Sequence, residues 1–478
     1  MTSNLILKWF DNCLVIEGNI SDDLLEKLSY WHRVYTQKNN KADIKNEKRV
    51  LYTQKNNNTL ITFSGYKDLI VNFCKQKNIN YTLKDRRKKL PEPKIHDALP
   101  ILKSYQQSPF IEAITQDKAG CLALATRFGK TYIMMAYCIA YSGCKILLAA
   151  PGVDLLGQLV KDFQAAFPNK KIQGVFTESP AKNVEDPDII ISSFESLHLC
   201  DKNIDLMLID EPHAAVTQER SVEINNFPAR KIGFGATLKN RFDQADTLIE
   251  GIIGPVLTKR DYKDSLKVGA VCPIKAYMVK YVFDDFDVKE RNSAYKKLVY
   301  QNQEFIQLVA DILNNYVPAD WQSLIFINNQ KQADFYKNHI NNAHIGMDKL
   351  FKTKKHRNEF MANMVNNEIK RCICSNIYNQ GITFPDLQLV VNCAGGGKST
   401  SSVQRPGRLA QIRPNKNAGY VVDFLFECKQ ANTKDKSELL GESGWKYVVN
   451  DSINRYKVYK DTGYEVEIVS DPSSLVFN

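Results

Sequence analysis

Several features that would narrow the class of this 478-residue chain are absent from its sequence. No stretch approaches the roughly eighteen consecutive apolar residues of a membrane-spanning helix, and the start, MTSNLILKWFDN, has no basic region followed by an apolar one. The net charge is moderate: 64 Lys and Arg against 53 Asp and Glu give +11, which permits a polyanionic partner without requiring one. We therefore expect neither a membrane span nor a leader peptide.

Paired cysteines are also missing. The eleven cysteines include no CxxC pair, and the two closest, Cys372 and Cys374, flank Ile373 within an apolar run. Because structural zinc sites use closely spaced ligand pairs, we do not expect a zinc site. Such cysteines are typical of reduced thiols, and therefore of a cytoplasmic protein.

The composition itself is that of a globular protein, with 44% hydrophobic and 24% charged residues over a length that suggests about three domains. Residues 1–84 predict a small α+β module. Its elements are strands at 5–10 and 13–18, a helix over 20–34 capped by Ser21, a hairpin formed by 49–54 and 59–65, and a helix over 66–78. The sequence leaves open whether this module binds nucleic acid or only packs against the rest of the chain.

A basic linker over residues 85–98 follows the module. The run Lys84, Arg86, Arg87, Lys88 and Lys89 leads into two prolines at 91 and 93. Closely spaced prolines after a charge run are typical of a linker. The basic side chains form either a solvated connector or a strip that contacts phosphates, and both interpretations stay open.

From residue 99 onward, compact apolar runs alternate with amphipathic stretches, which is typical of a doubly wound α/β sheet. The runs at 121–125, 145–150, 188–194, 205–210 and 231–237 predict the strands of one domain, 99–265. Those at 323–328, 371–376, 387–392 and 418–424 predict the strands of a second domain, 266–430. This second domain starts with one long helical pattern over 288–316. The C-terminal extension, 431–478, predicts strands around a turn at 461–463.

The sharpest local motif is ATRFGKT at 125–131, between an apolar strand and a helix. Gly129, Lys130 and Thr131 have the residue types of a phosphate-binding loop. In such a loop backbone N–H groups surround the phosphates, the lysine contacts them and the hydroxyl binds Mg²⁺. The usual first glycine is missing, because Arg127 stands near its place. An ordinary helix N-terminus remains an alternative.

Two adjacent carboxylates, Asp210 and Glu211, end the apolar strand at 205–210. Ligands of open α/β sheets bind at the carboxyl ends of strands, so Asp210 is a candidate for holding Mg²⁺ and Glu211 for deprotonating a water. A solvated acidic strand end is the alternative.

Two weaker motifs are GAT at 235–237 and QRPGR at 404–408. The planar guanidinium of Arg408 in the second motif is suited to stabilising charge on a transferring phosphoryl group.

Taken in order, these motifs resemble those of the superfamily-two helicases, and most closely the UvsW type of phage DNA helicase and its restriction-subunit-like relatives. The resemblance runs from about residue 99 to 426. It includes the adenine-side segment LKSYQ, motif I (ATRFGKT), motif Ia (AAPGVDLLGQL), motif Ib (ISSFESL), motif II (DEPH), motif III (GFGATLKNRFD), motif IV (SLIFINN), and motifs V and VI within 374–409. Together, these ordered motifs over this length are a strong signal, although no single one is.

The resemblance implies two tandem RecA-like domains with ATP bound between them. It implies an ATP-dependent DNA helicase or translocase that unwinds or remodels branched DNA, with ATP and Mg²⁺ as cofactors. The partner would be single-stranded, duplex or branched DNA, and the motor would be monomeric. For a phage protein it also implies the host cytoplasm and roles in repair, recombination and replication.

The same resemblance implies a role for each motif residue. The nucleotide would be bound by Gln106, Thr126, Arg127, Phe128, Gly129, Lys130, Thr131, Gly381, Arg408 and Arg413. Catalysis would depend on Lys130, Asp210, Glu211, Gln404 and Arg408, with Mg²⁺ on Thr131 and Asp210. His213 and Thr237 would couple nucleotide state to domain closure. Nucleic acid would contact Pro151, Gly152, Ser193 and Phe194, and the basic strip Arg86, Arg87, Lys88 and Lys89.

The chain departs from the family pattern at Arg127, at Gln411, where a second motif VI arginine is usual, and at Thr383, where motif V usually has aspartate. Because an arginine finger is worth ~10³-fold or more in rate, either Arg405 or Arg413 compensates or the ATPase is slow. Two alternatives remain: an RNA helicase or remodeller with the same motor, and a catalytically weakened nucleic-acid-binding scaffold.

Overall fold

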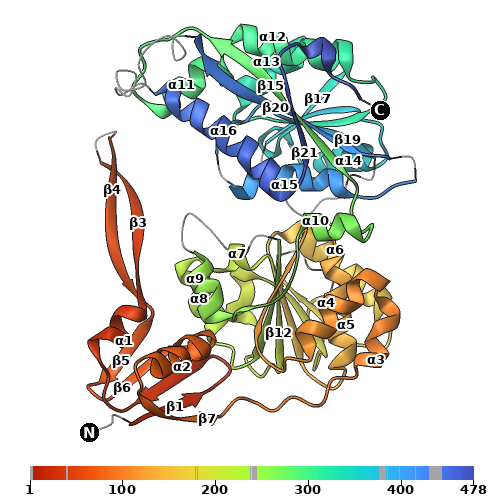
Figure 1. The fold of residues 1–478 in the computed structure, drawn as a ribbon. Helices are drawn as coiled ribbons and strands as arrows, with labels where there is room; N and C mark the ends of the chain where they lie inside the picture. Colours follow the sequence, from red (N-terminus) through yellow and green to blue (C-terminus); the bar gives the residue numbers. More distant parts are fainter. Residues whose placement is uncertain are drawn as a thin grey trace. The chain divides into compact units, whose positions relative to one another are not determined.

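The computed structural model describes residues 4–38, 41–177, 179, 181–236, 238, 245–375, 384, 386–397, 399–414, 416–429 and 444–477. The chain divides into two compact units: Met1–Ala125 with Gly129–Arg260, and Thr126–Phe128 with Asp261–Asn478. Each unit contains a seven-stranded sheet (Figure 1). The first unit also carries a five-stranded sheet and a separate two-stranded ribbon at its N-terminal end.

The N-terminal module is built on the five-stranded sheet, in the order β5-β6-β2-β1-β7. Its strands are β1 (Asn4–Trp9), β2 (Cys13–Glu17), β5 (Tyr52–Asn56), β6 (Thr59–Phe63) and β7 (Asn80–Asp85). Helices α1 (Asp22–Lys27) and α2 (Lys67–Gln76) supply apolar side chains to one core with the alternate residues of the strands. The predicted α+β module, its hairpin and its second helix are therefore confirmed.

The predicted helix over 20–34 is only partly correct. Ser21 does cap α1, because its Oγ accepts from the backbone N–H of Leu24, but the helix ends at Lys27. Residues 29–38 instead form β3 (Ser29–Lys38), which pairs along its whole length with β4 (Lys41–Val50). The reason is composition: Tyr, Trp, Val and Thr crowd this segment, and aromatic and β-branched residues favour the extended chain.

The module packs directly on the seven-stranded sheet domain of its own unit. The Tyr66 hydroxyl donates to the carbonyl of Thr247 at 2.7 Å, and Asn12 Nδ2 donates to the carbonyl of Asn225 at 3.3 Å. A Cβ at Gly65 would lie 1.8 Å from the Glu250 carbonyl oxygen, so only glycine allows this approach. The module is thus docked by specific contacts and is not a loosely tethered appendage.

The first large domain has seven strands, in the order β10-β11-β9-β12-β13-β8-β14. They are β8 (Gly120–Leu124), β9 (Ile146–Ala150), β10 (Ile172–Val175), β11 (Ile189–Ser193), β12 (Leu206–Asp210), β13 (Arg230–Gly235) and β14 (Val256–Arg260). All neighbouring pairs are parallel. The five strands predicted from apolar runs are confirmed, while the short β10 and the half-exposed β14 were not predicted because neither is a continuous apolar run.

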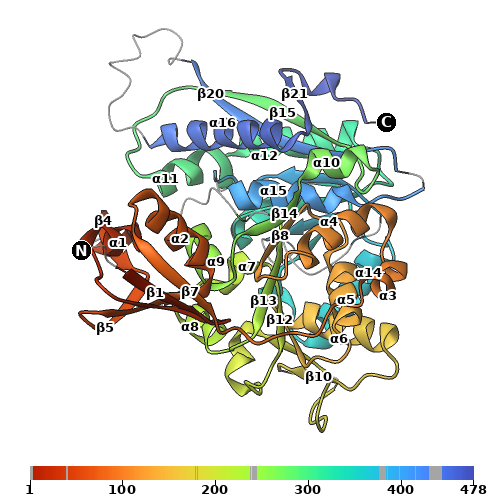
Figure 2. The same cartoon turned by 60° about the horizontal axis from the view of Figure 1, so that its bottom comes forward.

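Helices cover both faces of this sheet, as expected for a doubly wound fold. Helices α3 (Ile95–Ala98), α4 (Ser104–Ile114), α5 (Lys130–Ala140) and α6 (Val153–Ala166) lie on one side of it, and α7 (Pro212–Ala215), α8 (Gln218–Asn225) and α9 (Ala245–Ile252) on the other (Figures 1 and 2). The central strands β8, β9, β11, β12 and β13 are therefore buried throughout. Burial on both faces explains why their sequences do not alternate.

The second large domain repeats this plan with the strand order β17-β18-β16-β19-β20-β15-β21, again all parallel. Its strands are β15 (Ile274–Phe283), β16 (Gln322–Phe326), β17 (Ala343–Gly346), β18 (Arg371–Cys374), β19 (Leu387–Asn392), β20 (Gly419–Cys428) and β21 (Glu465–Val469). Its helices include α10 (Tyr262–Lys267), α11 (Arg291–Tyr295), α12 (Gln303–Asp311), α13 (Gln330–His339), α14 (Lys354–Val365), α15 (Ser399–Gly407) and α16 (Trp445–Thr462).

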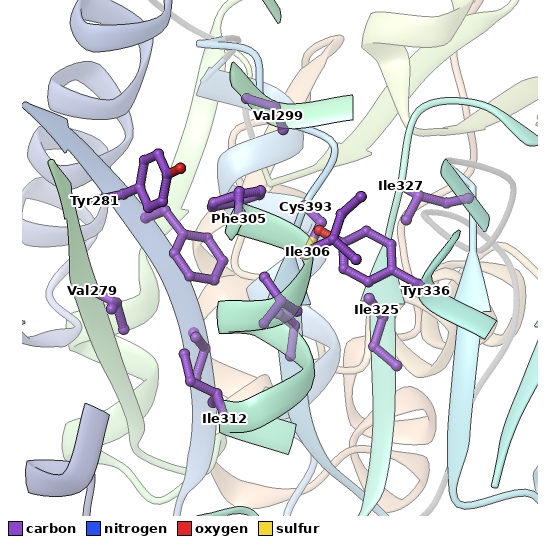
Figure 3. Packing of buried hydrophobic residues seen from close by; sticks show 14 of the residues in the cluster. Val279, Tyr281, Val299, Phe305, Ile306, Ile312, Ile325, Ile327, Tyr336 and Cys393 are labelled. Atoms are coloured by element: carbon purple, nitrogen blue, oxygen red, sulfur yellow. The ribbon is translucent and has the colours of Figure 1, made fainter. Parts of the chain in front are cut away.

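The larger core of the second domain lies between α12 and the sheet. Phe305 and Ile306 of α12 lie between strand residues that include Tyr281 and Ile325 (Figure 3). The rings of Tyr281 and Phe305 meet edge to face with centroids 5.2 Å apart. Two seven-stranded parallel sheets with helices on their faces confirm the predicted fold class, two tandem RecA-like domains with a small N-terminal module.

Two predictions for the second domain are corrected by the structure. The pattern over 288–316 is not one helix: it breaks at Gln301, and Asn302 caps α12 by accepting from the Phe305 N–H at 3.1 Å. The extension forms a strand only after 461–463, where β21 (Glu465–Val469) follows, because Trp445–Thr462 before it is a single helix, α16. Gly463 does end it, with φ +98°, as a left-handed residue after a helix does.

The described cysteines carry no disulfide: all eleven are free thiols and ten of them are buried. Within the described ranges no group of three or more His, Cys, Asp or Glu is placed to hold a metal ion. In that same part of the chain, no helix combines the length and the apolar character that crossing a membrane requires.

Candidate active site

The loop between β8 and α5 has the backbone of a phosphate-binding turn. Gly129 has φ +90° and forms the N-cap of α5, and Arg127 is also left-handed at +70°. A Cβ on Gly129 would lie 2.3 Å from Nε2 of Gln106, so this position requires glycine on two grounds. Helix α5 then begins at Lys130, which leaves the N–H groups of its first turn to point toward the loop.

Gln106 fixes this loop from the side. It lies in the first turn of α4 and is 1% exposed. Its Oε1 accepts from the Lys103 backbone N–H at 2.9 Å, and its Nε2 donates to the Gly129 carbonyl at 3.2 Å. The residue for which the resemblance implies an adenine contact therefore also holds the phosphate loop in place.

The two acidic residues follow the central strand β12. Asp210 is its last residue and is 8% exposed. Glu211 has φ +49°, a conformation that is uncommon for a residue with a Cβ, and its N–H donates to the Phe234 carbonyl of β13 at 2.9 Å. Left-handed strain of this kind costs of the order of 1–2 kcal/mol and is often kept where a side chain must point to a functional site.

The side chains of the two motifs meet. Lys130 Nζ forms an ion pair with Glu211 and lies 3.7 Å from Asp210 Oδ1. On its other side Glu211 Oε2 lies 3.2 Å from Nδ1 of His213. The order β12-β13-β8 separates the two parent strands by one strand, so the loops after them converge at one edge of the sheet.

Burial and charge move the pKa values of the two carboxyl groups in opposite directions. Desolvation raises the pKa of Asp210 to about 6 even though Lys130 opposes it. Desolvation also acts on Glu211, but Lys130 and His213 outweigh it and lower its pKa to about 2. The pKa of Lys130 is raised because the carboxylates more than offset its desolvation. At neutral pH the cluster is one ammonium between two carboxylates, suited to a ligand that brings both a cation and phosphates.

Asp210 fits a divalent cation better than its neighbour does. Its Oδ1 is buried and makes no hydrogen bond to any described residue. Magnesium is usually held by one or two carboxylates together with substrate phosphates. Asp210 meets that requirement, and Thr131 lies one residue after Lys130 in the first turn of α5, where a hydroxyl ligand is expected.

The residues predicted to contact nucleic acid in the first domain differ in accessibility. Pro151 and Gly152 follow β9, and Gly152, with φ +82°, begins α6. Phe194 is 2% exposed and packs into the core, so its side chain is almost inaccessible to a bound ligand. Ser193 is buried, and its Oγ accepts from the Ser196 N–H at 3.2 Å. The position of Ser193 and Phe194 along a nucleic-acid track stays a prediction, and a nucleic acid there would meet mainly backbone atoms.

Half of the predicted basic strip has a structural role. Arg87 stacks over the Trp9 ring at 3.7 Å and pairs with Asp85 at 2.7 Å. Lys88 pairs with Asp205 of the first large domain. Arg86 and Lys89 are exposed. The strip thus links the N-terminal module to the domain, and of its four basic side chains only that of Arg87 is mostly covered.

In the second domain the motif VI arginines are not equivalent. Arg405 of α15 is buried and donates from Nη1 to Asn392 Oδ1 at 2.6 Å, with its guanidinium 5.1 Å from the Phe326 ring centre. Arg408 is also buried, whereas Gln404 and Arg413 are half-buried. Arg405 is thus engaged inside its own domain.

Some predicted residues lie outside the described part of the chain. These are Thr237 of motif III, and Gly381 and Thr383 of motif V.

One group of residues was missed by sequence reasoning: Asp423, Arg455 and Asn392 form a buried polar network behind motif VI. The signal that could have found it is Asp423 itself, a charged residue inside the apolar run 418–424.

The fold and the Lys130–Asp210–Glu211 cluster define a class of protein, the P-loop ATPases with tandem RecA-like domains. Residues 76–240 match the family described as type III restriction enzyme, res subunit, and residues 304–413 match the helicase conserved C-terminal domain. The chain therefore belongs to the superfamily-two helicases, a family of ATP-hydrolysing enzymes.

Individual proteins resemble the chain at low identity. The protein named "Putative ATP-dependent helicase IRC3" of Saccharomyces cerevisiae is 23% identical over 371 residues, which are 68% of this chain and 52% of IRC3. The DNA-bound type ISP restriction-modification enzyme LlaBIII is 14% identical with a TM-score of 0.54, over 86% of this chain and 35% of that one. T4 UvsW is 16% identical with a TM-score of 0.42, over 98% and 99% of the two chains. The chain spans about half the length of the curated relatives it matches.

Proposed function

We propose that this chain is an ATP-dependent DNA helicase or translocase that uses ATP hydrolysis to unwind or remodel DNA, including branched DNA. The observation that carries the proposal is the cluster in which Lys130 lies between Asp210 and Glu211 at the carboxyl ends of β8 and β12. These three residues occur in the order and types of motifs I and II. A lysine, a metal-binding carboxylate and a second carboxylate are the parts that ATP hydrolysis needs at one point.

We assign each residue of the cluster a task in ATP hydrolysis. Lys130 is held by Glu211 before nucleotide binds, and phosphates of ATP would replace that carboxylate as its partner. Glu211 would then be released to accept a proton from the attacking water, with His213 beside it. Asp210 and Thr131 would hold Mg²⁺, which neutralises charge on the phosphates when bound. Gln404 and Arg408 would act on the same phosphates, as their resemblance to motif VI implies.

The β3–β4 ribbon supports nucleic acid as the partner. Between residues 29 and 50 there are six Lys or Arg and two Asp or Glu, a net charge of 6 − 2 = +4 within a chain of net +11. The ribbon pairs only with itself and stands away from the module that carries it (Figure 1). At its base the Trp31 side chain is 57% exposed. An isolated basic strand pair with exposed aromatic surface suits a phosphate backbone and stacked bases.

RNA as the partner is the alternative of the same class. The LlaBIII structure contains DNA, but solved structures with similar TM-scores include one bound to RNA, Dbp5 of Saccharomyces cerevisiae, at 0.50. The restriction-enzyme family matched by residues 76–240 favours DNA. Comparing ATPase stimulation by matched DNA and RNA strands separates the two.

A catalytically weakened scaffold is the alternative of another class. Arg127, Gln411 and Thr383 motivate it. A scaffold would gain nothing from the strained backbone of Glu211 or from a buried Asp210 oxygen without a hydrogen bond. Both features lower the stability of the fold. The retained cluster therefore favours an active ATPase.

One ATPase panel tests the proposal. Wild type, Lys130→Ala and Gln411→Arg are assayed without nucleic acid and with single-stranded, duplex, forked and four-way DNA, and with RNA. We expect stimulation by DNA, loss of activity in Lys130→Ala, and equal or higher turnover in Gln411→Arg. Absence of stimulation by every nucleic acid would refute the helicase proposal. A strand-displacement assay then distinguishes unwinding from translocation alone.

A further inference from the structure

The buried network behind motif VI is centred on Asp423 in β20, which has no solvent exposure. Arg455 of α16 pairs with it bidentately, Nε to Oδ2 at 2.9 Å and Nη2 to Oδ1 at 3.0 Å. The Tyr459 hydroxyl donates to Oδ2 at 2.7 Å, and Asn392 Nδ2 donates to the same oxygen at 2.9 Å. Two residues of the C-terminal helix are thus bonded to the centre of the sheet.

The network continues from Asp423 to the motif VI helix. Asn392, the last residue of β19, has its Nδ2 on Asp423 and its Oδ1 on Arg405 Nη1, at 2.6 Å. With both ends of its amide engaged, Asn392 has one favourable orientation. Arg405 lies in α15 between Gln404 and Arg408. The chain of contacts Arg455, Asp423, Asn392, Arg405 therefore joins α16 to α15.

A second set of contacts reaches the start of α15. The loop Gly395–Gly397 runs between β19 and α15, and Gly396 is left-handed, with φ +82°. Arg455 Nη1 donates to the Gly396 carbonyl at 2.8 Å, and the Gly396 N–H donates to the Tyr295 hydroxyl at 3.0 Å. That hydroxyl donates in turn to Asp451 Oδ2 of α16 at 2.5 Å. Helix α16 therefore holds both the loop before α15 and a side chain within it.

We propose that the C-terminal helix α16 is a positioning element of the ATPase, and that Arg455 and Asp423 are positioning residues that fix α15 and thereby Gln404 and Arg408. This inference rests on the proposed function, because it gives α16 a task in ATP hydrolysis. It assigns a role to residues 445–462, which carry no helicase motif.

The physical basis is the stiffness of the contacts. A bidentate arginine–carboxylate pair fixes distance and angle together, and burial removes the water that would otherwise compete. Groups that stabilise phosphoryl transfer must be held to within about 0.5 Å, and a misplacement of 1 Å costs of the order of 10²-fold in rate. A lysine at 455 keeps the charge but not the second hydrogen bond.

The test uses the full-length chain and three variants. Arg455→Lys loosens the pair at Asp423. Asn392→Leu cuts the link between Asp423 and Arg405 while leaving the ion pair intact. Arg371→Lys is the matched control: Arg371 is equally buried in the same domain, where it bonds to Asn314 Oδ1 at 2.8 Å and to the Leu313 carbonyl at 2.6 Å, away from motif VI. Tm is measured for each, and DNA-stimulated ATPase is assayed well below the lowest Tm.

We expect Arg455→Lys and Asn392→Leu each to lower kcat at least ten-fold with KM for ATP changed less than three-fold, and Arg371→Lys to keep kcat within two-fold. The Arg455→Lys/Asn392→Leu double variant should lose less than the product of the two single losses, because both substitutions interrupt the chain of contacts through Asp423 and Asn392. Equal kcat losses in all three single variants, multiplicative losses in the double variant, or unchanged kcat in the two test variants would each overturn the inference. A wild type with no DNA-stimulated ATPase would instead overturn the proposed function.

Discussion

Replacement of Glu211 by Gln distinguishes most sharply between an active ATPase and a catalytically weakened scaffold. The substitution keeps the size of the side chain and one oxygen that accepts from Lys130, but it removes the negative charge and the capacity to take a proton. Asp210, Lys130 and the backbone of β12 are untouched. The variant therefore tests one chemical function within an otherwise intact cluster.

The effect on stability follows from the two opposite pKa shifts. The lowered pKa of Glu211 means that the fold favours its ionised form, and the raised pKa of Asp210 means that the fold disfavours the ionised form of that residue. Replacing Glu211 removes the first gain, but it also removes the repulsion that helps raise the pKa of Asp210. The two changes act in opposite directions, so we expect a loss of less than about 2 kcal/mol in the free energy of unfolding.

The effect on catalysis should be far larger. A positioned general base contributes roughly 10²–10⁴-fold, which corresponds to about 3–5 kcal/mol of transition-state stabilisation. ATP binding should remain within a few-fold, because Lys130 no longer has to leave a carboxylate when the phosphates arrive. The predicted signature is therefore a large loss in kcat with little change in affinity or fold.

Three measurements on the same preparation check this signature. DNA-stimulated ATPase at saturating ATP gives kcat, a fluorescent ATP analogue gives affinity, and urea unfolding gives stability. Asp162→Asn is a suitable control, because Asp162 lies on α6 and accepts an exposed hydrogen bond from Gln158 at 2.6 Å. A Glu211→Gln variant that is folded, binds nucleotide and turns over within three-fold of wild type would refute the assignment of Glu211 as the base.

Further predictions concern the phosphate loop, the charge cluster and the ribbon. Gly129→Ala should lower the free energy of unfolding by about 1–2 kcal/mol, because φ +90° is unfavourable for alanine and its Cβ would press on Gln106; it should also weaken ATP binding, and urea unfolding with nucleotide titration checks both. Lys130→Met should raise the folded-state pKa values of Asp210 and Glu211 above their unfolded values, so the stability of the variant should fall as pH rises through the folded-state pKa values. Urea midpoints at pH 5 and 8 should show the larger loss at pH 8. Equal losses at both pH values would contradict the ion-pair cluster. Asp210 carries its proton below about pH 6 in the free protein, so the Mg²⁺ concentration needed for half-maximal ATPase should increase between pH 7 and 5.5, and an unchanged requirement would argue against Asp210 as the ligand. The triple variant K38Q/K41Q/K45Q in the ribbon should weaken DNA binding at low salt and reduce the slope of log K against log salt by up to about three, whereas an unchanged slope would exclude the ribbon from the contact.

Much of the fold was predictable because its strands are buried on both faces. A strand such as β9 or β12 leaves a short, continuous apolar run that needs no knowledge of its neighbours. The ribbon and α16 were not predictable in this way. The ribbon segment follows a true helix start at Ser21, and α16 buries polar residues such as Asp451 and Arg455 on its inner face, so neither shows a clean apolar pattern.

The candidate site shows the same division. The loop residues Gly129 and Lys130 and the pair Asp210 and Glu211 could be picked out by type and spacing, since phosphate and metal chemistry demand those groups. Spacing did not reveal that Phe194 is buried or that Arg87 and Lys88 pair within the protein. The exposure of a residue depends on every element that covers it, and the residues of a motif do not indicate which elements these are.

By itself, the sequence determined the strand-and-helix rhythm of two α/β domains, the chemistry of the phosphate loop and the order of the motifs, because these depend on short-range periodicity and residue type. Only the tertiary structure decided that Lys130 lies between carboxylates eighty residues away, that their pKa values separate, and that the C-terminal helix bonds to motif VI. Strand order determines which loops converge, and burial determines how strongly the charges in those loops interact. Both arise from contacts between segments that are remote along the chain.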